Sequence, residues 1–294
     1  METQNAVLGI SYCIVSLVLF VLNGVVLKAL TRHVEYKTNT YRIIKNMCVA
    51  CMFQLLPFFV GGLMTLFNTL FHYYVDRVFG VLIASGWFFY LALSLTLAID
   101  RLVIFTLPKT FAFSDKITNC LLLISWLFWI FNVVILSWPG FGYTYTGEDD
   151  FLDMWSNTND EESLMMASVE AYFDLIILSI ILLIYLIVCG YLVKMRLSSS
   201  IQLKSFIVEI KIFLIAVISF SYETLLILYS FWVEPFSDDQ RLVNICVNVA
   251  WMVDCGLFVI VTLIINQSLR RRVLELIGAN INKSTAVTSL TARK

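Results

Sequence analysis

Residues 87–109 read WFFYLALSLTLAIDRLVIFTLPK, an apolar segment that contains two adjacent full charges, Asp100 and Arg101, near its end. An ionisable side chain deep in a membrane-spanning helix costs about 2.5–3.5 kcal/mol on the lenient insertion scales, so such residues are usually paired, near the membrane interface or functional. Two interpretations of this pair stay open. Either Arg101 reaches the lipid headgroups while Asp100 neutralises its charge, or the pair serves the function of the protein.

The composition excludes a soluble core of this length. Hydrophobic residues make up 60% of the chain and charged residues 14%, and the mean hydropathy is +0.86. Such values are typical of a polytopic membrane protein. Segments of sufficient length to cross a hydrocarbon core of about 30 Å occupy residues 6–30, 43–67, 79–105, 117–138, 164–193, 206–233 and 242–265. We therefore expect an all-α membrane protein, a bundle of seven transmembrane helices within one domain over residues 1–277.

The basic residues predict how this bundle is oriented. Most of them lie in or beside the first, third and fifth linkers and the carboxyl-terminal tail: Lys28, Arg32, Lys37, Arg42, Lys45, Arg101, Lys109, Lys116, Lys194, Arg196, Lys204, Lys211, Arg270, Arg271, Arg272, Lys283, Arg293 and Lys294. Only Arg77 and Arg241 fall on the other side. Short cytoplasmic loops retain basic residues, so we expect the amino terminus outside and the carboxyl terminus in the cytoplasm. The net charge of −1 hides this asymmetry and says nothing about nucleic acid, but the sequence shows no basic face for such a partner, so we expect none.

The end of the chain predicts a short helix followed by a polar tail. Residues 267–277 place Leu269, Val273, Leu274 and Ile277 on one side of a helix, with arginines among them, which suits an amphipathic eighth helix on the inner lipid leaflet. The tail, residues 278–294, is expected to be disordered. Its serines and threonines are candidate kinase targets that would recruit an arrestin-like partner.

Several motifs resemble those of a known receptor family. The run Asp100-Arg101-(six residues)-Pro108 resembles the inner end of helix three in rhodopsin-like seven-helix G-protein-coupled receptors. In that family the arginine meets the G protein, so the resemblance implies that Asp100, Arg101 and Pro108 serve G-protein coupling. Asn23 lies in a run that resembles the family's Asn-x-x-Val pattern in helix one, although a buried asparagine that hydrogen-bonds a neighbouring helix is also a common structural device.

Motifs near the end of the chain narrow the resemblance. Trp251, Cys255 and Gly256 form a Trp-x-x-x-Cys-Gly run, and residues 266–270 resemble the Asn-x-x-(Phe or Leu)-Arg start of the family's short eighth helix. The combination resembles nematode serpentine chemoreceptors of class T or class X. It implies a chemosensory receptor in the plasma membrane, at the cilium of a sensory neuron. Such a receptor senses a small extracellular molecule and promotes nucleotide exchange on a heterotrimeric G protein.

The chain also departs from the rhodopsin-like pattern. Cys51 stands where the family has an aspartate that binds sodium and acts as a hinge, and the switch prolines of helices six and seven are missing. The usual disulfide position at the top of helix three falls near Asp76, and residues 139–163 contain no cysteine. All seven cysteines lie within the predicted spans, where we interpret them as small apolar residues.

Acidic residues on the outer side are candidates for ligand binding. Glu170 and Asp174 are four residues apart, so both carboxylates lie on one helix face near the mouth of the bundle. The preceding loop carries many further acidic residues, which fit either a solvated translocated loop or a vestibule that attracts cations.

Two carboxylates lie inside the predicted spans. We expect Asp254 near the midplane, on a face shared with Trp251, where it replaces the charge missing at Cys51 and serves with Asn23 in an ion- or proton-linked switch. We expect Glu223 nearer the outside, where it meets a cationic or hydrogen-bond-donating group of the ligand, and Trp251 is a further ligand contact. The alternative for each carboxylate is a protonated acid that hydrogen-bonds a neighbouring helix.

Other function classes fit less well. His33 and His72 fall on opposite sides of the membrane, which excludes a shared metal site, and the sequence has no phosphate-binding or nucleophile motif. We therefore expect no enzymatic activity, cofactor or metal. A small-solute transporter is the remaining alternative, because seven spans can arise from two three-helix repeats joined by a linker helix. However, no motif recurs between the first and last three spans.

Overall fold

The computed structural model describes residues 2–106, 111–147, 152–157, 161–197 and 203–278. Its helices are α1 (Glu2–Arg32), the short 3-10 helix η1 (Val34–Tyr36), α2 (Asn39–Phe67), α3 (Tyr73–Thr106), α4 (Phe111–Leu136), α5 (Glu161–Leu197), α6 (Leu203–Trp232), α7 (Gln240–Ile265) and α8 (Gln267–Leu276). Two strands, β1 (Thr144–Thr146) and β2 (Met154–Ser156), pair antiparallel between α4 and α5.

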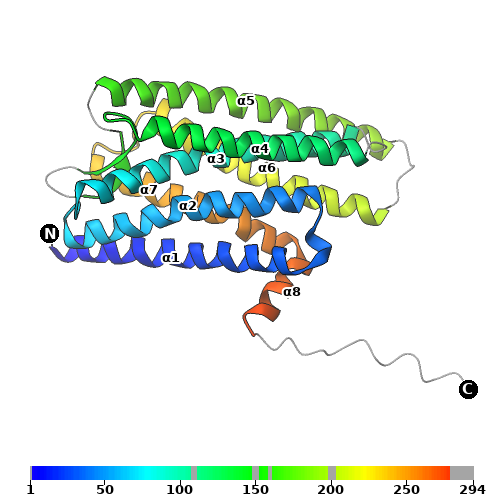
Figure 1. Ribbon diagram of the computed structural model, residues 1–294, viewed down its shortest axis with the longest axis horizontal. Coiled ribbons are helices and arrows are strands. Elements are labelled where there is room, and N and C mark those ends of the chain that lie inside the picture. The colour runs from blue at the N-terminus through cyan, green and yellow to red at the C-terminus, as the bar shows by residue number, and fades with distance from the viewer. Residues whose placement is uncertain (1, 107–110, 148–151, 158–160, 198–202, 279–294) are drawn as a thin grey trace, which may run out of the picture.

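The structure confirms the predicted fold class. Helices α1 to α7 are each long and apolar enough to cross a membrane, and they run along a common axis in Figure 1, while α8 turns away from that axis. The helices begin or end up to six residues beyond the apolar segments; α3, for example, begins at Tyr73 where hydropathy predicted Phe79. Hydropathy marks the part that suits the hydrocarbon core, whereas backbone hydrogen bonding continues into the polar flanks.

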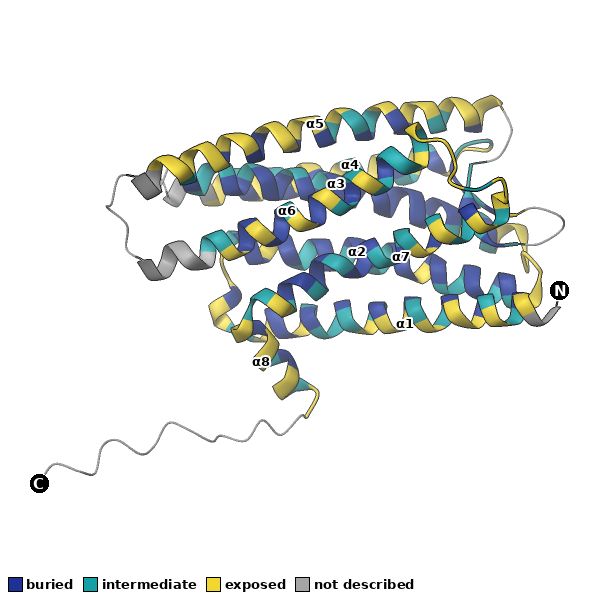
Figure 2. Cartoon of the chain, turned by 180° about the vertical axis from the view of Figure 1, so that it is seen from behind, coloured by how far each residue is buried: buried dark blue, intermediate teal, exposed yellow. Residues whose placement is uncertain are grey.

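Helix α3 lies at the centre of the bundle. Of its most apolar 18-residue stretch, 72% is buried, against 22% for both α4 and α5. It packs against α2, α4, α5 and α6. Figure 2 shows exposed residues along the outer side of α5, where Ile176, Ile180 and Leu183 are large exposed apolar side chains. Residues of α3 can therefore contact several other helices, at either end of the bundle.

Two glycines allow α1 and α2 to pack closely. A Cβ atom on Gly9 would lie 2.7 Å from the carbonyl oxygen of Gly62, and a Cβ atom on Gly62 would lie 2.9 Å from the backbone nitrogen of Cys13. Small residues at such positions let membrane helices approach until their backbones touch, which increases van der Waals contact.

The β1–β2 hairpin lies at the same end of the bundle as the amino terminus (Figure 1). Tyr145 and Trp155 face each other across it and are both 1% exposed. The backbone nitrogen of Tyr145 donates to Asp76 Oδ1 over 2.9 Å, and its hydroxyl lies 2.6 Å from that of Thr65. Trp155 Nε1 donates to the carbonyl oxygen of Pro57 over 3.1 Å. Side-chain hydrogen bonds thus hold the hairpin between α2 and α3.

This anchoring takes the place of a covalent link. All seven cysteines lie in the described part of the chain and are free thiols. Asp76, near the position where rhodopsin-like receptors tie this loop to helix three, holds it by a hydrogen bond instead. Gly80, one turn further along α3, leaves room for the hairpin, because a Cβ atom there would lie 1.8 Å from the carbonyl oxygen of Tyr143.

We expect Gly80→Ala to displace the hairpin and destabilise the protein by about 1–3 kcal/mol, the usual cost of overpacking. Gly190→Ala on α5 is the matched control, because a Cβ atom at Gly190 meets nothing within 4 Å. Thermal unfolding of the two purified variants measures the difference. The Gly80 variant should melt several degrees below the wild type and the Gly190 variant at or above it. Equal melting temperatures would contradict this packing of the hairpin.

Candidate functional site

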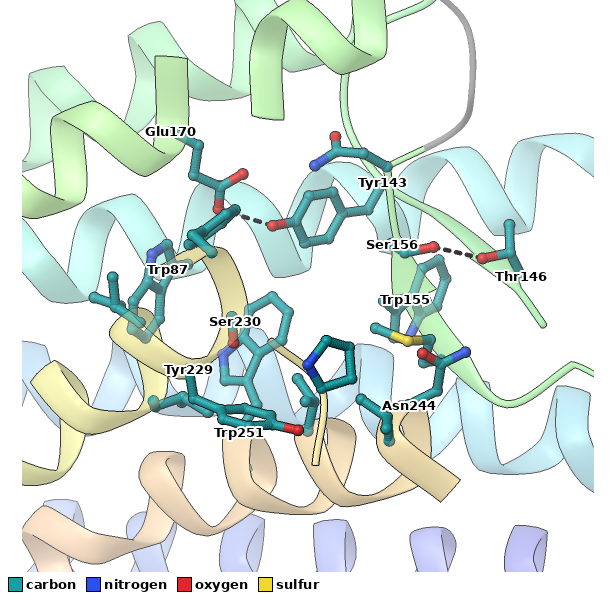
Figure 3. A pocket seen from close by; sticks show the side chains of 18 of the residues that line it. Trp87, Tyr143, Thr146, Trp155, Ser156, Glu170, Tyr229, Ser230, Asn244 and Trp251 are labelled. Atoms are coloured by element: carbon teal, nitrogen blue, oxygen red, sulfur yellow. Dashed lines mark hydrogen bonds between the residues drawn. The ribbon is translucent and has the colours of Figure 1, made fainter. Parts of the chain in front are cut away.

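A cavity of about 710 Å³ lies at the amino-terminal end of the bundle. It is lined by residues of α3, α5, α6 and α7 and of the segment that contains the hairpin (Figure 3). This volume is within the range of about 300–1,000 Å³ that is usual for small-molecule sites. The cavity is therefore the candidate ligand site.

The two carboxylates predicted on one face of the fifth helix both line this cavity. Glu170 is 3% exposed, and its Oε1 accepts a hydrogen bond of 2.8 Å from the hydroxyl of Tyr143. Asp174 is fully buried, and its Oδ2 accepts a hydrogen bond of 3.0 Å from Trp87 Nε1. Its second oxygen, Oδ1, is buried without a hydrogen-bond partner. The i, i+4 spacing on α5 directs both side chains inward.

Trp251 on α7 also lines the cavity, as the sequence predicts for a ligand contact. Its ring meets those of Trp87 and Tyr143 edge to face, and its Nε1 donates to Gln54 Oε1 over 2.8 Å. The amide of Gln54 in turn donates to the carbonyl oxygen of Gly86 over 3.3 Å. Trp251 thus connects the cavity to α2 and α3 through hydrogen bonds.

Glu223 is the candidate ligand residue that the structure separates from the other three. It does not line the large cavity but a void of only about 10 Å³ beside α3, where Ser94 Oγ lies 3.5 Å from its Oε1. Position along the sequence indicates how deep Glu223 lies in the bundle but not that its side chain turns toward α3. Asp174 and Asp254 are both close enough to Glu223 for the charges of these side chains to interact.

The three residues predicted to form a switch lie together. Asp254 is 2% exposed, its Oδ1 has no hydrogen-bond partner, and it interacts electrostatically with Cys51 on α2. Asn23 on α1 donates to the carbonyl oxygen of Cys255, the next residue along α7, over 3.1 Å. The carboxylate at Asp254 is therefore beside the position where the rhodopsin-like pattern has its aspartate.

Arg101 lies at the opposite end of the bundle from the cavity and is fully buried. Its guanidinium pairs with Asp100 Oδ2 over 2.6 Å and forms further hydrogen bonds with Glu209 on α6 and Thr40 on α2. Asp100 also accepts a hydrogen bond of 2.8 Å from Thr40. In this conformation Arg101 does not reach the lipid, and it joins three helices. Pro108, the third predicted coupling residue, lies outside the described residues.

The eighth helix follows directly on α7. Leu269 and Val273 are buried, whereas Leu274 and Ile277 are exposed, so the predicted apolar side divides between the bundle and the surroundings. Arg272 on α8 forms an ion pair of 3.1 Å with Glu35 of η1. Its hydrogen bond lowers the pKa of Glu35 below the usual range. This contact links the first linker to α8.

The sequence did not point to five residues on which these sites depend: Thr40, Gln54, Trp87, Tyr143 and Glu209. One of them carries a recognisable signal, because Glu209 is an isolated acidic residue between Lys204 and Lys211. The others are ordinary residues in apolar segments or in a loop, and only their spatial neighbours distinguish them.

Comparisons with known proteins give the fold and the family of this chain. The crystal structure of squid rhodopsin superposes on the chain with a TM-score of 0.69 and 14% sequence identity, covering 95% of this chain and 86% of that chain. At this identity the match shows the fold alone. No curated protein sequence matches the chain. The family model described as "Serpentine type 7TM GPCR chemoreceptor Srt" matches residues 1–286, which confirms the resemblance to serpentine chemoreceptors. The chain therefore belongs to the Srt family of seven-transmembrane G-protein-coupled chemoreceptors and is a multi-pass membrane protein.

Proposed function

We propose that this receptor binds a small molecule in the cavity at its amino-terminal end and promotes nucleotide exchange on a heterotrimeric G protein at the end that carries α8. Arg101 and its partners Asp100, Thr40 and Glu209 form the Arg101 cluster. The observation that carries the proposal is that this cluster lies at the opposite end of the bundle from the cavity. The basic residues beside the first, third and fifth linkers support an amino terminus outside the cell and a cytoplasmic α8. We place the receptor in the plasma membrane, at a sensory cilium.

The contacts of Arg101 hold one end of the bundle in a closed arrangement. This is the end that would meet the G protein. Arg101 on α3 and Glu209 on α6 are paired, and the guanidinium is fully buried, while the Glu209 side chain is 33% exposed. A G protein can contact this arginine only if α6 moves away from α3 and the ion pair breaks. The ligand would act by favouring the state in which that pair is broken, since a ligand shifts an equilibrium only by binding one state better.

A series of polar side chains supports communication between the two ends. Asp174 in the cavity interacts electrostatically with Glu223, and Glu223 with Asp254. Glu223 and Glu209 both lie on α6, so a movement of this helix affects the carboxylate below the cavity and the partner of Arg101 together. We propose that Asp254, with Cys51 and Asn23 beside it, sets the balance between the two states through a bound ion or proton.

Membership of a receptor family favours this proposal over the transporter alternative. Two partners remain predictions. The serines and threonines of the tail lie outside the described residues, so recruitment of an arrestin-like protein rests on the sequence alone. Contact of α8 with the lipid surface rests on the exposure of Leu274 and Ile277. A screen of small molecules read out by G-protein activation, with labelled-solute flux through proteoliposomes as the counter-assay, tests the receptor assignment.

We expect Arg101→Ala to abolish nucleotide exchange on a co-purified G protein, because the arginine would no longer be available to contact it. Exchange and surface expression should be measured in parallel, since the substitution also leaves Asp100 without its cation. Surface expression close to the wild type with no exchange supports a coupling role. A proportional loss of both would instead assign the arginine to folding.

Glu209→Gln should raise nucleotide exchange in the absence of ligand, because it weakens the contact that holds α6 against α3. A partly exposed ion pair is worth about 1 kcal/mol, so the expected increase is about fivefold. Glu35→Gln is the control, since it removes an ion pair at the same end of the bundle that does not involve α6. Unchanged basal exchange in the Glu209 variant would contradict the role of this ion pair in holding α6 against α3.

The switch assigned to Asp254 predicts a change in basal exchange for Asp254→Asn. The amide keeps the shape of the side chain but can neither bind sodium as a carboxylate nor take up a proton. Basal exchange measured across sodium concentration and pH should therefore lose its dependence on both. Asp239→Asn, at the amino-terminal cap of the same helix, is the control. Wild-type sodium and pH profiles for the Asp254 variant would reassign this residue to structural hydrogen bonding.

A further inference from the structure

The charges around the cavity are unbalanced. Glu170 and Asp174 both line it, and the described lining residues include no lysine, arginine or histidine. Both carboxylates have neutral hydrogen-bond partners: Glu170 has the hydroxyl of Tyr143 and the side chain of Asn157, and Asp174 has the indole nitrogen of Trp87. Neutral donors stabilise a carboxylate but do not cancel its charge. A cation supplied by the ligand would complete the electrostatics of the site.

One carboxylate oxygen of a residue that lines the cavity lacks a hydrogen-bond partner. Asp174 Oδ1 is buried and has no hydrogen-bond partner, although Oδ2 of the same side chain is bonded to Trp87. An unpaired buried acceptor is costly in a folded protein unless a ligand or water satisfies it. The N–H group of an ammonium ion is a donor that also carries the missing charge.

Three aromatic rings gather next to these carboxylates. The ring centroids of Trp87 and Trp251 are 5.8 Å apart at an angle of 79°, and those of Tyr143 and Trp251 are 5.8 Å apart at 85°. In an edge-to-face pair the positive edge of one ring meets the negative face of the other, so neither of these pairs is stacked. Figure 3 shows these three side chains and Glu170 around the same open space. Such a group of rings attracts ammonium ions through the negative potential of the ring faces.

We infer that the ligand of this receptor is an organic amine in its ammonium form, held by Asp174 and Glu170 and surrounded by Trp87, Trp251 and Tyr143. The inference rests on the proposed receptor function, whose ligand class it names. The ammonium N–H donates to Asp174 Oδ1, and the charge lies beside the ring faces. The remaining apolar lining, which includes Leu226 and Ile227, accepts the carbon skeleton of the ligand.

Binding to the purified full-length receptor tests the inference without a G protein. The probes are phenethylamine and its neutral counterpart 2-phenylethanol, which have the same skeleton and differ in charge. Tryptophan fluorescence and calorimetry report binding. We expect saturable binding of the amine and at least about tenfold weaker binding of the alcohol. Binding of the alcohol as tight as that of the amine, or no saturable binding of the amine, overturns the inference.

Charge-removing variants locate the binding site. Asp174→Asn and Glu170→Gln keep the size of each side chain and should each weaken binding of phenethylamine by about tenfold or more, with little effect on the alcohol. Glu162→Gln is the matched control, because it makes the same change at an exposed position on the same helix. A thermal melt close to that of the wild type shows that a variant is folded. Wild-type affinity for the amine in both cavity variants overturns the inference.

The outcome is separable from that of the proposed function. Amine binding without nucleotide exchange on any G protein would support the ligand class and contradict the coupling role. Exchange driven by a neutral or anionic compound that binds in the cavity would support the receptor function and contradict the ligand class.

Discussion

The closed arrangement of this receptor depends on the compensation of one buried guanidinium. Arg101 is placed in an apolar bundle, where an unpaired charge would be strongly destabilising, so its two terminal nitrogens need hydrogen-bond partners, although Nε is buried without one. Asp100 supplies one from the same helix, while Thr40 and Glu209 supply others from α2 and α6. Three helices are thereby held in one relative position. Because Glu209 is the partner most accessible to solvent, the contact with α6 is the one that can be exchanged for another.

At the amino-terminal end of the bundle, hydrogen bonds and close packing hold the structure in place of a covalent bond. The hairpin forms one wall of the cavity and is held by the Asp76 side chain, by hydrogen bonds of Tyr145 and Trp155, and by the space that Gly80 leaves on α3. A disulfide would hold the loop to α3 whatever the ligand does. Hydrogen bonds instead allow the loop to shift at modest cost, because each is worth about 0.5–1.5 kcal/mol.

Helix α6 is the element that both ends share. Glu223 and Glu209 lie 14 residues apart on it, about 21 Å along the axis. One faces the polar residues below the cavity and the other faces Arg101. A rigid helix that carries a carboxyl group at each site can couple them, since a tilt or rotation alters both contacts together. This coupling does not need the helix prolines of rhodopsin-like receptors, provided that the helix moves as a body.

The sequence by itself determined the seven helices, the adjacency of Asp100 and Arg101, and the common face of Glu170 and Asp174, because hydropathy and helical spacing are local properties. Only the tertiary structure decided that Glu209 pairs with Arg101 across more than one hundred residues, that Trp87 and Tyr143 meet the two carboxylates, and that Glu223 turns away from the cavity. These contacts depend on how far each helix is rotated and shifted against its neighbours. The rotation and shift result from packing of the whole bundle, so no single segment encodes them.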